Sequence, residues 1–365
     1  MDSPLRVGVV GLGQGEAHVR GFQYAEGSQV VALCALEEDE LKQVARRFDV
    51  PLLYNNYEQM LEEADLDVVV IATPDHLHAR QAMQALSKGK HVLSEIPMAT
   101  TLQECEQMIE LVEETGLKYQ MGNQVRYAPC VVHIKSLVDD GTLGDIFYGE
   151  GEYLHNTEEY YTSTGRGWEH WRTDSTIPQR SFTGGGMHAI DTLRWLMKGR
   201  FVEVQGYGGN FVYKQVPGKE DLSVALFRTE RGSIAKVLTS GGIQRTYCLY
   251  YSVYGTQGSV ERNRIQDFFG VDTTNYLYLH DQMWQLRNMI PVPVYNWTDP
   301  LIKERSSHGT MEIAQAMDFV KAILTDRQPL VNVYEAARSS AAAIMALQAI
   351  DRHECVTIPT FSEKT

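Results

Sequence analysis

The sequence predicts two domains: an α/β domain built on a parallel sheet, followed by an α+β domain built on a large, mostly antiparallel open sheet. Three observations support this prediction. The chain has 365 residues, which is more than one typical hydrophobic core accommodates. Short apolar runs alternate with helical patterns in the first third, as in βαβ units. Later segments alternate and are rich in aromatic residues, as antiparallel strands are.

The elements of the first domain follow from local patterns. Its apolar runs are predicted strands, at residues 5–10, 30–35, 68–72 and 91–94. Helical patterns such as EEDELKQVARRF and LHARQAMQALSKG lie between them. Thr101 and Glu104 form a capping box, which predicts a helix that starts there, runs through Glu114 and ends at Gly116. These elements complete a domain over residues 1–122.

Residues 123–365 are predicted to form the second domain. A helical stretch at 129–140 precedes the segments IFYGEGEYL, VEVQGYGGNFVYK and YCLYYSVYG, which are predicted antiparallel strands. An alanine-rich helical tail follows from residue 311 to about 351. The sequence contains no fixed-period repeat and no low-complexity linker.

Composition limits the partners. The chain has 33 Lys and Arg against 47 Asp and Glu, and its net charge of -14 disfavours nucleic acid and anionic membranes. A small molecule is the expected partner. The five cysteines are scattered and lack metal-type spacing, so we expect reduced, mostly buried thiols and a cytoplasmic location. The N-terminus lacks a signal-peptide pattern, and no apolar run is as long as a membrane span.

A glycine-rich turn, VGVVGLGQGEAH, opens the first domain. Gly11 and Gly13 follow a strand and precede a helix, where glycines let the backbone approach a pyrophosphate. With Gln14 they are the predicted cofactor contacts. Gly15 falls one position early for the usual third glycine, and Glu16 occupies that place. A tight turn without a ligand is the alternative, but the setting favours a dinucleotide.

The second predicted strand bears on the choice of cofactor. An acidic residue normally closes this strand and binds the ribose hydroxyls, but here Ala35 stands there and Glu37 follows two residues later. Glu37 or Glu38 is the candidate ribose ligand, and a solvated first helical turn is the alternative. Since no arginine is placed for a 2′-phosphate, NAD is preferred, and NADP stays open.

Ligands of open α/β sheets bind beyond the carboxyl ends of the strands. Thr73, Pro74 and His76 follow the third predicted strand, so we expect them near the nicotinamide half of the cofactor. His78 is interpreted as an ordinary residue of the first helical turn. Glu95 closes the fourth strand, where its carboxylate can accept a hydrogen bond from a ribose or substrate hydroxyl; a surface charge beside a turn is the alternative.

Several motifs together resemble the Gfo/Idh/MocA family, which includes glucose-fructose oxidoreductase and inositol dehydrogenase. They are the glycine turn, ATPDHLHARQAMQALSKGKHVLSEIP, GNQVRYAP and YGTQGSVE, and the resemblance covers essentially the whole chain. It implies a Rossmann domain, then a domain with a large open sheet often used for homo-oligomerisation. It also implies NAD(P)-dependent oxidation of sugar or inositol hydroxyls.

Two departures from the family pattern affect the chemistry. The fourth strand of the family usually ends in E-K-P, whose lysine reaches the reacting hydroxyl, but here Ile96 replaces it and cannot hydrogen-bond. The segment FTGGGMHAIDTLRW resembles the family's D-x-x-x-H segment, with His188 retained and Gly184 in place of the aspartate. Asp191 matches a following acidic position. His188 is therefore the predicted base, with a structural histidine as the alternative.

The segment 153–186 combines aromatic and polar residues with few aliphatic ones. Aromatic rings stack on sugar C–H faces and polar groups bind hydroxyls, so we predict a carbohydrate-binding loop, with an oligomer contact as the alternative. Its predicted substrate contacts are Tyr153, His155, Trp168, Trp171 and Arg172. Arg126 and Asp191 are further predicted substrate contacts. His155, His170 and His188 lack a known metal-ligand spacing, so no metal site is predicted.

Three classes of function remain open. The leading one is a sugar or polyol dehydrogenase with His188 as base and Glu95 orienting the substrate or ribose. The second is a redox-neutral enzyme that transiently oxidises a glycoside, eliminates the aglycone and restores the hydride, as some relatives in this family do. The third is a non-catalytic binding protein, which Ile96, Gly184 and Ala35 favour.

Overall fold

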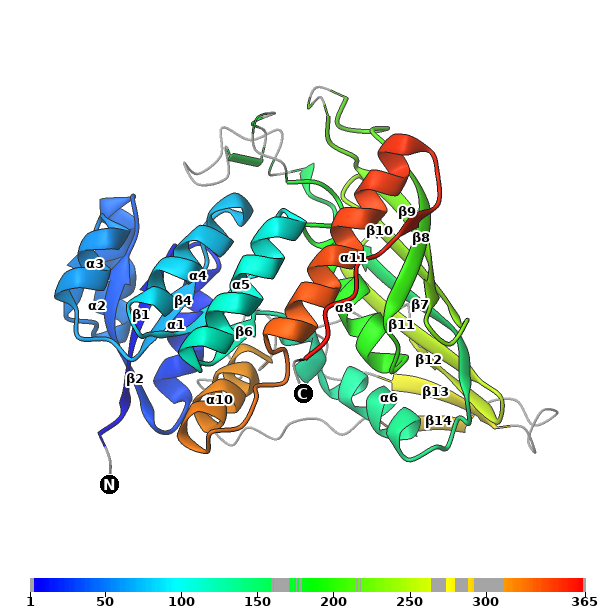
Figure 1. Cartoon of the computed structure of the whole chain (residues 1–365), viewed down its shortest axis with the longest axis horizontal. Coiled ribbons are helices and arrows are strands. Elements are labelled where there is room, and N and C mark those ends of the chain that lie inside the picture. Colours follow the sequence, from blue (N-terminus) through cyan, green and yellow to red (C-terminus); the bar gives the residue numbers. More distant parts are fainter. Residues whose placement is uncertain are drawn as a thin grey trace. The chain divides into compact units, whose positions relative to one another are not determined.

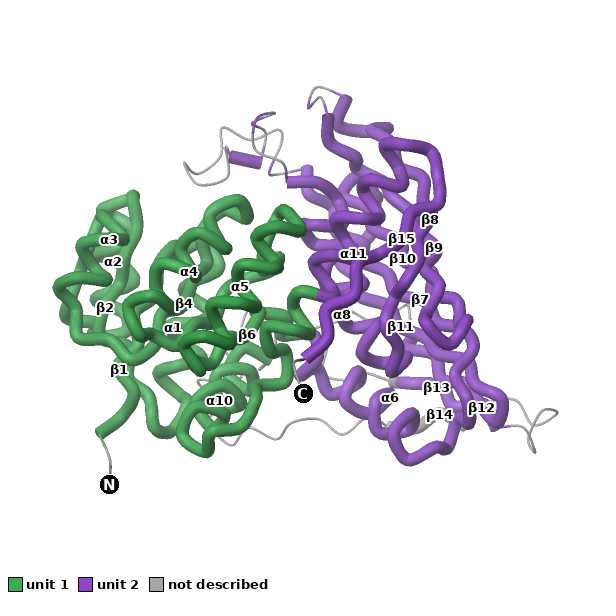
Figure 2. Tube along the Cα trace, in the orientation of Figure 1, with its two compact units in different colours: residues 1–124, 300–337 green, residues 125–299, 338–365 purple. Residues whose placement is uncertain are grey.

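The computed structural model describes residues 3–363, with gaps at 159, 161–170, 173, 175, 177–178, 215, 217, 264–273, 280–287 and 292–310. The chain divides into two compact units (Figures 1 and 2). Unit 1 comprises residues 1–124 and 300–337, and unit 2 comprises residues 125–299 and 338–365. The first break lies near the predicted one at 122. However, residues 311–337, which the sequence grouped with the second domain, belong to unit 1.

Unit 1 contains a six-stranded parallel sheet in the order β3-β2-β1-β4-β5-β6, the order of a Rossmann fold. This confirms the predicted fold class. The strands are β1 (Leu5–Val10), β2 (Ser28–Cys34), β3 (Leu52–Tyr54), β4 (Val68–Ile71), β5 (His91–Ser94) and β6 (Tyr119–Met121). The apolar runs are buried because helices cover both faces of such a sheet.

The helices of unit 1 start and end at the expected signals. Thr101 caps α5 through a capping box with Glu104, and Gly116 ends it with φ of 67°. The helices are α1 (Gly15–Tyr24), α2 (Glu38–Phe48), α3 (Tyr57–Glu63), η1 (Asp75–Leu77), α4 (His78–Ser87), α5 (Leu102–Thr115) and α10 (Met311–Leu324). Helix α11 (Val333–Arg352) begins in unit 1 and continues in unit 2.

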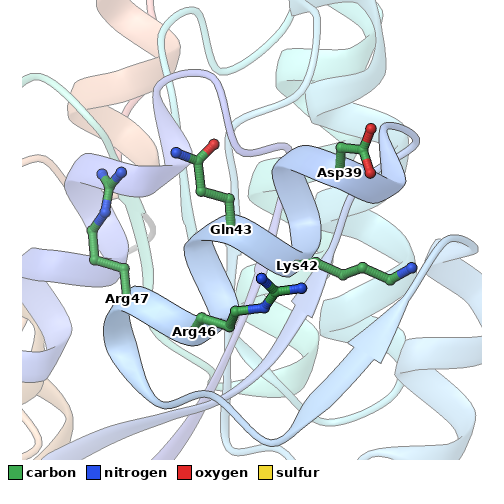
Figure 3. Close-up of a pocket in the computed structure, with 5 residues that line it drawn as sticks. All are labelled: Asp39, Lys42, Gln43, Arg46 and Arg47. Carbon is green, nitrogen blue, oxygen red and sulfur yellow. The ribbon is translucent and has the colours of Figure 1, made fainter.

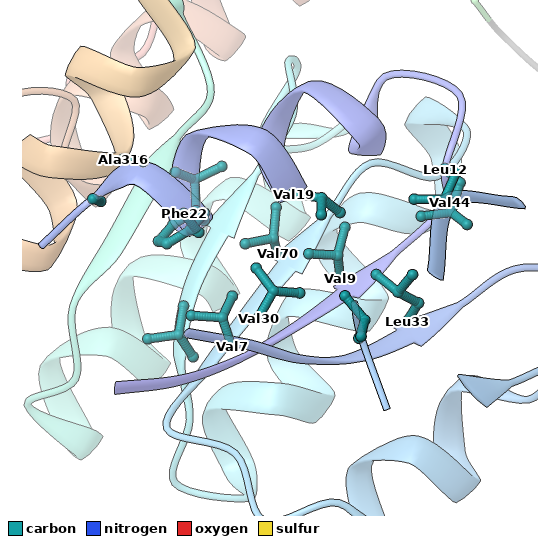
Figure 4. Close-up of a cluster of buried hydrophobic side chains, with 14 of the residues drawn as sticks. Val7, Val9, Leu12, Val19, Phe22, Val30, Leu33, Val44, Val70 and Ala316 are labelled. Atoms are coloured by element: carbon teal, nitrogen blue, oxygen red, sulfur yellow. The ribbon is translucent and has the colours of Figure 1, made fainter. Parts of the chain in front are cut away.

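Helix α10 completes the core of unit 1 by packing on α1. A Cβ at Gly21 would lie 2.9 Å from the carbonyl oxygen of Glu312, so the glycine allows the two helices to approach closely. The rings of Phe22 and Phe319 meet edge to face, with centroids 6.5 Å apart. Figure 4 shows Phe22 and Ala316 in one cluster with valines of the central strands. A segment about 290 residues later in the chain therefore closes the first core.

Unit 2 contains a nine-stranded sheet in the order β14-β13-β12-β11-β7-β10-β9-β8-β15. Among the described strands of this sheet, only the β7–β10 pair is parallel, so the prediction of a mostly antiparallel sheet is confirmed. The strands are β7 (Ile146–Leu154), β8 (Phe201–Gly209), β9 (Leu222–Thr229), β10 (Ile234–Ser240), β11 (Cys248–Gly255), β12 (Gly258–Arg262), β13 (Thr274–Leu279), β14 (Asn288–Pro291) and β15 (Val356–Thr357).

The helical elements near this sheet are η2 (Gln124–Tyr127), α6 (Pro129–Asp139) and α8 (Gly186–Leu196). Helix α8 packs on β7, β10 and β11. Among the described residues, no helix combines the length and apolar character needed to cross a membrane. Four cysteines are buried as expected, and Cys355 is exposed. Burial raises the pKa of the Cys34 thiol to about 12, which keeps it in the unreactive protonated form.

Candidate functional site

The glycine turn of unit 1 has the geometry of a cofactor cradle. Gly11 has φ of 80°, and a Cβ there would lie 2.5 Å from the carbonyl oxygen of Ala72. Gly13 and Gln14 are exposed at the start of α1, and the Gln14 side chain does not cap the helix. Gly15 is buried, and a Cβ there would lie 3.2 Å from Val9 Cγ1, so it provides the close helix–strand contact expected of a third glycine. These features fit a bound pyrophosphate.

Glu16, in the usual place of the third glycine, has its charge offset by two arginines. Its Oε1 atom lies 2.5 Å from Arg47 Nη1 on α2 and 3.5 Å from Arg20 Nη2 on α1. Opposite charges at these distances compensate the carboxylate. A negatively charged residue at this position is therefore compatible with a nearby anionic pyrophosphate.

The end of β2 offers both a polar and an apolar group to the adenosine half of a dinucleotide. Glu38 bonds with Lys42, and this interaction lowers the pKa of the Glu38 carboxyl. Glu37 is exposed at the N-cap of α2 without a side-chain capping bond, so it is the better ribose ligand of the two. Leu36 beside it is 88% exposed, an apolar surface at the edge of the site that the sequence analysis missed.

His78 connects the loops that follow β4 and β5. It is buried in the first turn of α4, where one ring nitrogen lies 2.9 Å from the carbonyl oxygen of Pro97 and the other 2.7 Å from that of Thr73. The Thr73 hydroxyl donates to Gln81 at 2.6 Å. The prediction placed His78 in the first turn correctly, but its ring also bridges the two loops. Pro74 and His76 are half-buried at η1, on the same loop.

Glu95 is partly enclosed at the end of β5. Its Oε1 atom lies 2.7 Å from Nε2 of His18, and its side chain is only 16% exposed. His18 is buried on α1, four residues after Gln14, so the glycine-turn helix also holds the carboxylate. His18 was not predicted as a site residue, although it closes the motif GQGEAH. Ile96 follows Glu95, is half-buried and precedes a cis peptide bond to Pro97.

Arg126 and Asp191 are paired with each other in the interior of unit 2. Arg126 donates two bonds of 2.7 Å to the two carboxylate oxygens of Asp191, and both side chains are fully buried. The Ser339 hydroxyl also donates to Asp191, at 2.6 Å. Burial raises the pKa of the Asp191 carboxyl, but the Arg126 guanidinium outweighs that effect and the pKa lies below its ordinary value.

This pair bears on one expectation. Both residues were predicted to contact substrate, yet each is 1% exposed or less. A buried bidentate pair holds two elements together, here η2 and α8, and does not present either group to a ligand. The pairing and burial of Arg126 and Asp191 favour a structural role for both residues.

His188 lies in the first turn of α8 and is 8% exposed. The ring of Tyr153, at the end of β7, stacks on its imidazole with centroids 5.9 Å apart and planes 26° apart. The Tyr153 hydroxyl lies 3.0 Å from His155 Nδ1. Tyr247, which the sequence analysis missed, contacts the rings of both Tyr153 and His155 edge to face. Three predicted site residues are thus brought together.

Arg172 extends this group of aromatic residues. Its guanidinium carbon lies 4.6 Å from the ring centroid of Trp171 and 4.9 Å from that of Tyr160, and Tyr160 contacts His155 edge to face. Stacked cations and aromatic rings can bind polar, ring-shaped ligands. The predicted contact Trp168 lies outside the described residues, as do Tyr161 and His170.

A surface hollow of about 420 Å³ lies along α2 and is lined by Asp39, Lys42, Gln43, Arg46 and Arg47 (Figure 3). All five residues belong to one helix, so the hollow brings together no groups from the ends of different strands. It is not the predicted site.

Several known proteins are similar to this chain over nearly its whole length. The alpha-N-acetylgalactosaminidase of Shewanella oneidensis is 25% identical, over 98% of this chain and 85% of that protein. Levoglucosan dehydrogenase in complex with NADH and levoglucosan has the same fold, with TM-score 0.84, 22% identity and coverage of 98% of this chain and 100% of that chain.

Scyllo-inositol dehydrogenase from Lactobacillus casei with bound NAD(H) and scyllo-inositol also shares the fold, with TM-score 0.77, 21% identity and coverage of 97% and 99%. The family model described as an oxidoreductase family with an NAD-binding Rossmann fold matches residues 5–123. The model of the GFO/IDH/MocA C-terminal domain matches residues 131–261. The chain therefore belongs to the Gfo/Idh/MocA family of NAD-binding oxidoreductases.

Proposed function

We propose that the protein oxidises a hydroxyl group of a sugar, sugar derivative or polyol, with NAD bound by unit 1 and the substrate bound by unit 2. The observation that carries this proposal is His188 in the first turn of α8, stacked against Tyr153 with His155 close by. An imidazole among aromatic rings and polar groups combines a base with surfaces that suit a sugar.

The residues of unit 1 fit a dinucleotide. The backbone of Gly11 approaches Ala72 so closely that no side chain fits, and the exposed residues Gly13 and Gln14 follow it just before α1. Glu37 would bind the adenosine ribose. Glu95, held by His18, would accept a hydrogen bond from the nicotinamide ribose or a substrate hydroxyl. Bound NAD would supply the hydride acceptor.

His188 is the proposed base. Oxidation of a carbinol breaks the C–H bond with loss of a hydride and breaks the O–H bond with loss of a proton, leaving a C=O group. The family lysine that would contact the hydroxyl is replaced by Ile96, which cannot hold a proton. The imidazole of His188 can accept this proton. His155 and Arg172 would orient the sugar ring.

A second candidate is redox-neutral cleavage of a glycoside, through transient oxidation, elimination of the aglycone and return of the hydride. Two observations favour it: the loss of the lysine at Ile96 and the 25% identity to an alpha-N-acetylgalactosaminidase. This reaction would liberate the aglycone without a net change in NADH.

We also propose that the protein forms homo-oligomers, which light scattering of the purified protein would test.

The decisive experiment compares wild type and His188→Ala in two assays. One follows NADH formation from NAD with a panel of sugars and polyols, and the other follows aglycone release from chromogenic glycosides. We expect NADH formation by wild type, and no turnover by His188→Ala with unchanged NADH binding. Aglycone release at constant NADH would establish the second candidate. Undiminished turnover by His188→Ala would refute the assignment of His188 as the base. Saturable NADH binding without turnover in either assay would favour a non-catalytic binding protein.

A further inference from the structure

Strand β7 carries small residues where α8 lies on it. Gly149, Gly151 and Tyr153 are at alternate positions and share one face of the sheet. A Cβ at Gly149 would lie 2.8 Å from Met197 Sδ, and one at Gly151 would lie 3.1 Å from the carbonyl oxygen of Ala189. The helix therefore rests directly on the strand. Tyr153 is the next residue in this row, where the helix begins.

Gly185, the N-cap of α8, provides the room for the Tyr153 ring. A Cβ at Gly185 would lie 2.2 Å from Cε1 and Cζ of Tyr153 and 2.7 Å from its hydroxyl oxygen. The backbone of Gly185 has φ of -56° and ψ of -29°, which any residue adopts. The position therefore requires glycine for space and not for backbone conformation.

The Tyr153 ring is held in this space by further contacts. Its hydroxyl lies 3.0 Å from His155 Nδ1, and Tyr247 meets its ring edge to face with centroids 5.6 Å apart. Its face lies against His188, with ring centroids 5.9 Å apart. Burial, followed by the effect of Tyr153, raises the pKa of Tyr247 well above its ordinary value, so Tyr247 stays neutral. The imidazole of His188 thus rests on a ring that is itself fixed.

We infer that Tyr153 is a positioning residue for His188, and that the glycine at 185 is required because it admits the Tyr153 ring. This inference rests on the proposed role of His188 as base. Stacking restricts rotation of the imidazole about its side-chain bonds, and a misplaced base can lower the rate by about 100-fold. The aromatic ring, more than the hydroxyl, carries the effect.

The test separates the ring from the hydroxyl. Tyr153→Phe keeps the ring and should lower kcat by less than about tenfold, the equivalent of one hydrogen bond. Tyr153→Leu and Gly185→Ala should each lower kcat by about 100-fold with little change in KM or in the Kd for NADH. The double variant Tyr153→Leu/Gly185→Ala should be no slower than Tyr153→Leu alone, since both changes remove the contact between the Tyr153 ring and His188.

A second measurement does not depend on turnover. The His188 ring proton resonance, assigned in histidine-labelled, NAD-free protein by its loss in His188→Gln, should show a ring-current shift that Tyr153→Phe keeps. Tyr153→Leu and Gly185→Ala should both abolish that shift. An unchanged resonance in Tyr153→Leu, or equal losses of kcat in Tyr153→Phe and Tyr153→Leu, would overturn the inference. If wild type turns over no substrate, the proposed function fails while the resonance still decides whether Tyr153 positions the imidazole.

Discussion

Asp191→Asn should destabilise unit 2 by about 3–5 kcal/mol, the usual cost of removing one partner of a buried ion pair. Asp191 accepts two bonds from Arg126 and one from Ser339, and the exposed fraction of both charged side chains is 0%. The substitution keeps the shape of the side chain and removes its charge. The buried Arg126 guanidinium would then lose the carboxylate that accepts two of its hydrogen bonds, and this penalty dominates the expected loss.

Denaturant unfolding followed by tryptophan fluorescence measures this loss selectively. All five tryptophans lie between residues 168 and 297, within the sequence range of unit 2, and the Trp195 ring centroid lies 5.2 Å from the Arg126 guanidinium carbon. The control is Arg200→Gln, which removes a partly exposed pair with Glu230 and should cost about 1 kcal/mol or less.

A double variant distinguishes loss of the pair from loss of packing. Arg126→Met combined with Asp191→Leu removes both charges at similar volume and should recover most of the stability. A loss below about 1 kcal/mol for Asp191→Asn would refute the reasoning, because breaking a buried ion pair by removing one charge costs more than that.

The contribution of Asp191 to the stability of unit 2 should depend on pH in a definite direction. The pKa of Asp191 lies below its ordinary value in the folded protein, so the folded state binds this proton less readily than the unfolded state does. The ionised carboxylate therefore stabilises unit 2 fully above the ordinary pKa of about 3.9. That contribution disappears as the pH falls below this value, so the difference between wild type and Asp191→Asn should shrink in acid.

The remaining predictions concern the cofactor and the altered site. Gly11→Ala should raise the Kd for NADH at least about tenfold, because positive φ and the contact with Ala72 exclude a Cβ; an unchanged Kd by tryptophan-to-NADH energy transfer would contradict the cradle. Glu37→Gln should weaken NADH binding about threefold to tenfold, because it removes the charge from one hydrogen bond to the ribose. The matched variant Glu38→Gln should leave NADH binding unchanged. Equal effects of the two substitutions would reject Glu37 as the ribose ligand. Ile96→Lys should not raise kcat on the best substrate, since Ile96 is half-buried and its position suits an apolar group. A large gain in kcat would show that the site is an ordinary family site weakened by one substitution.

Local sequence signals predicted most of unit 1. The predicted strands 5–10 and 91–94 have the observed bounds, and the capping box of α5 forms as expected, because these patterns depend on neighbouring residues. Strands β3 and β6 have three residues each, too few to show a pattern, and were not predicted. The place of α10 in unit 1 depends on its contact with Gly21 of α1, about 290 residues earlier, which no local pattern reveals.

The candidate site, too, could be predicted only in part from local sequence signals. The glycine turn and the rule that ligands bind beyond strand ends were enough to propose Gly11 and Glu95, because both need only the local pattern and the strand order. The partners of the polar groups did not follow from any pattern. His18 was not linked to Glu95, and Arg126 was expected to face substrate although it pairs with Asp191.

By itself, the sequence determined the fold class, the dinucleotide turn and the residue types available for chemistry, since backbone conformation and hydrophobic period are local properties. Tertiary structure alone decided which polar groups are buried in pairs and which lie beside one another. Gly185 illustrates the difference: its backbone is ordinary, and only the ring of Tyr153, 32 residues earlier, explains the missing side chain. Contacts between distant segments depend on how elements pack, and that information lies in the whole fold.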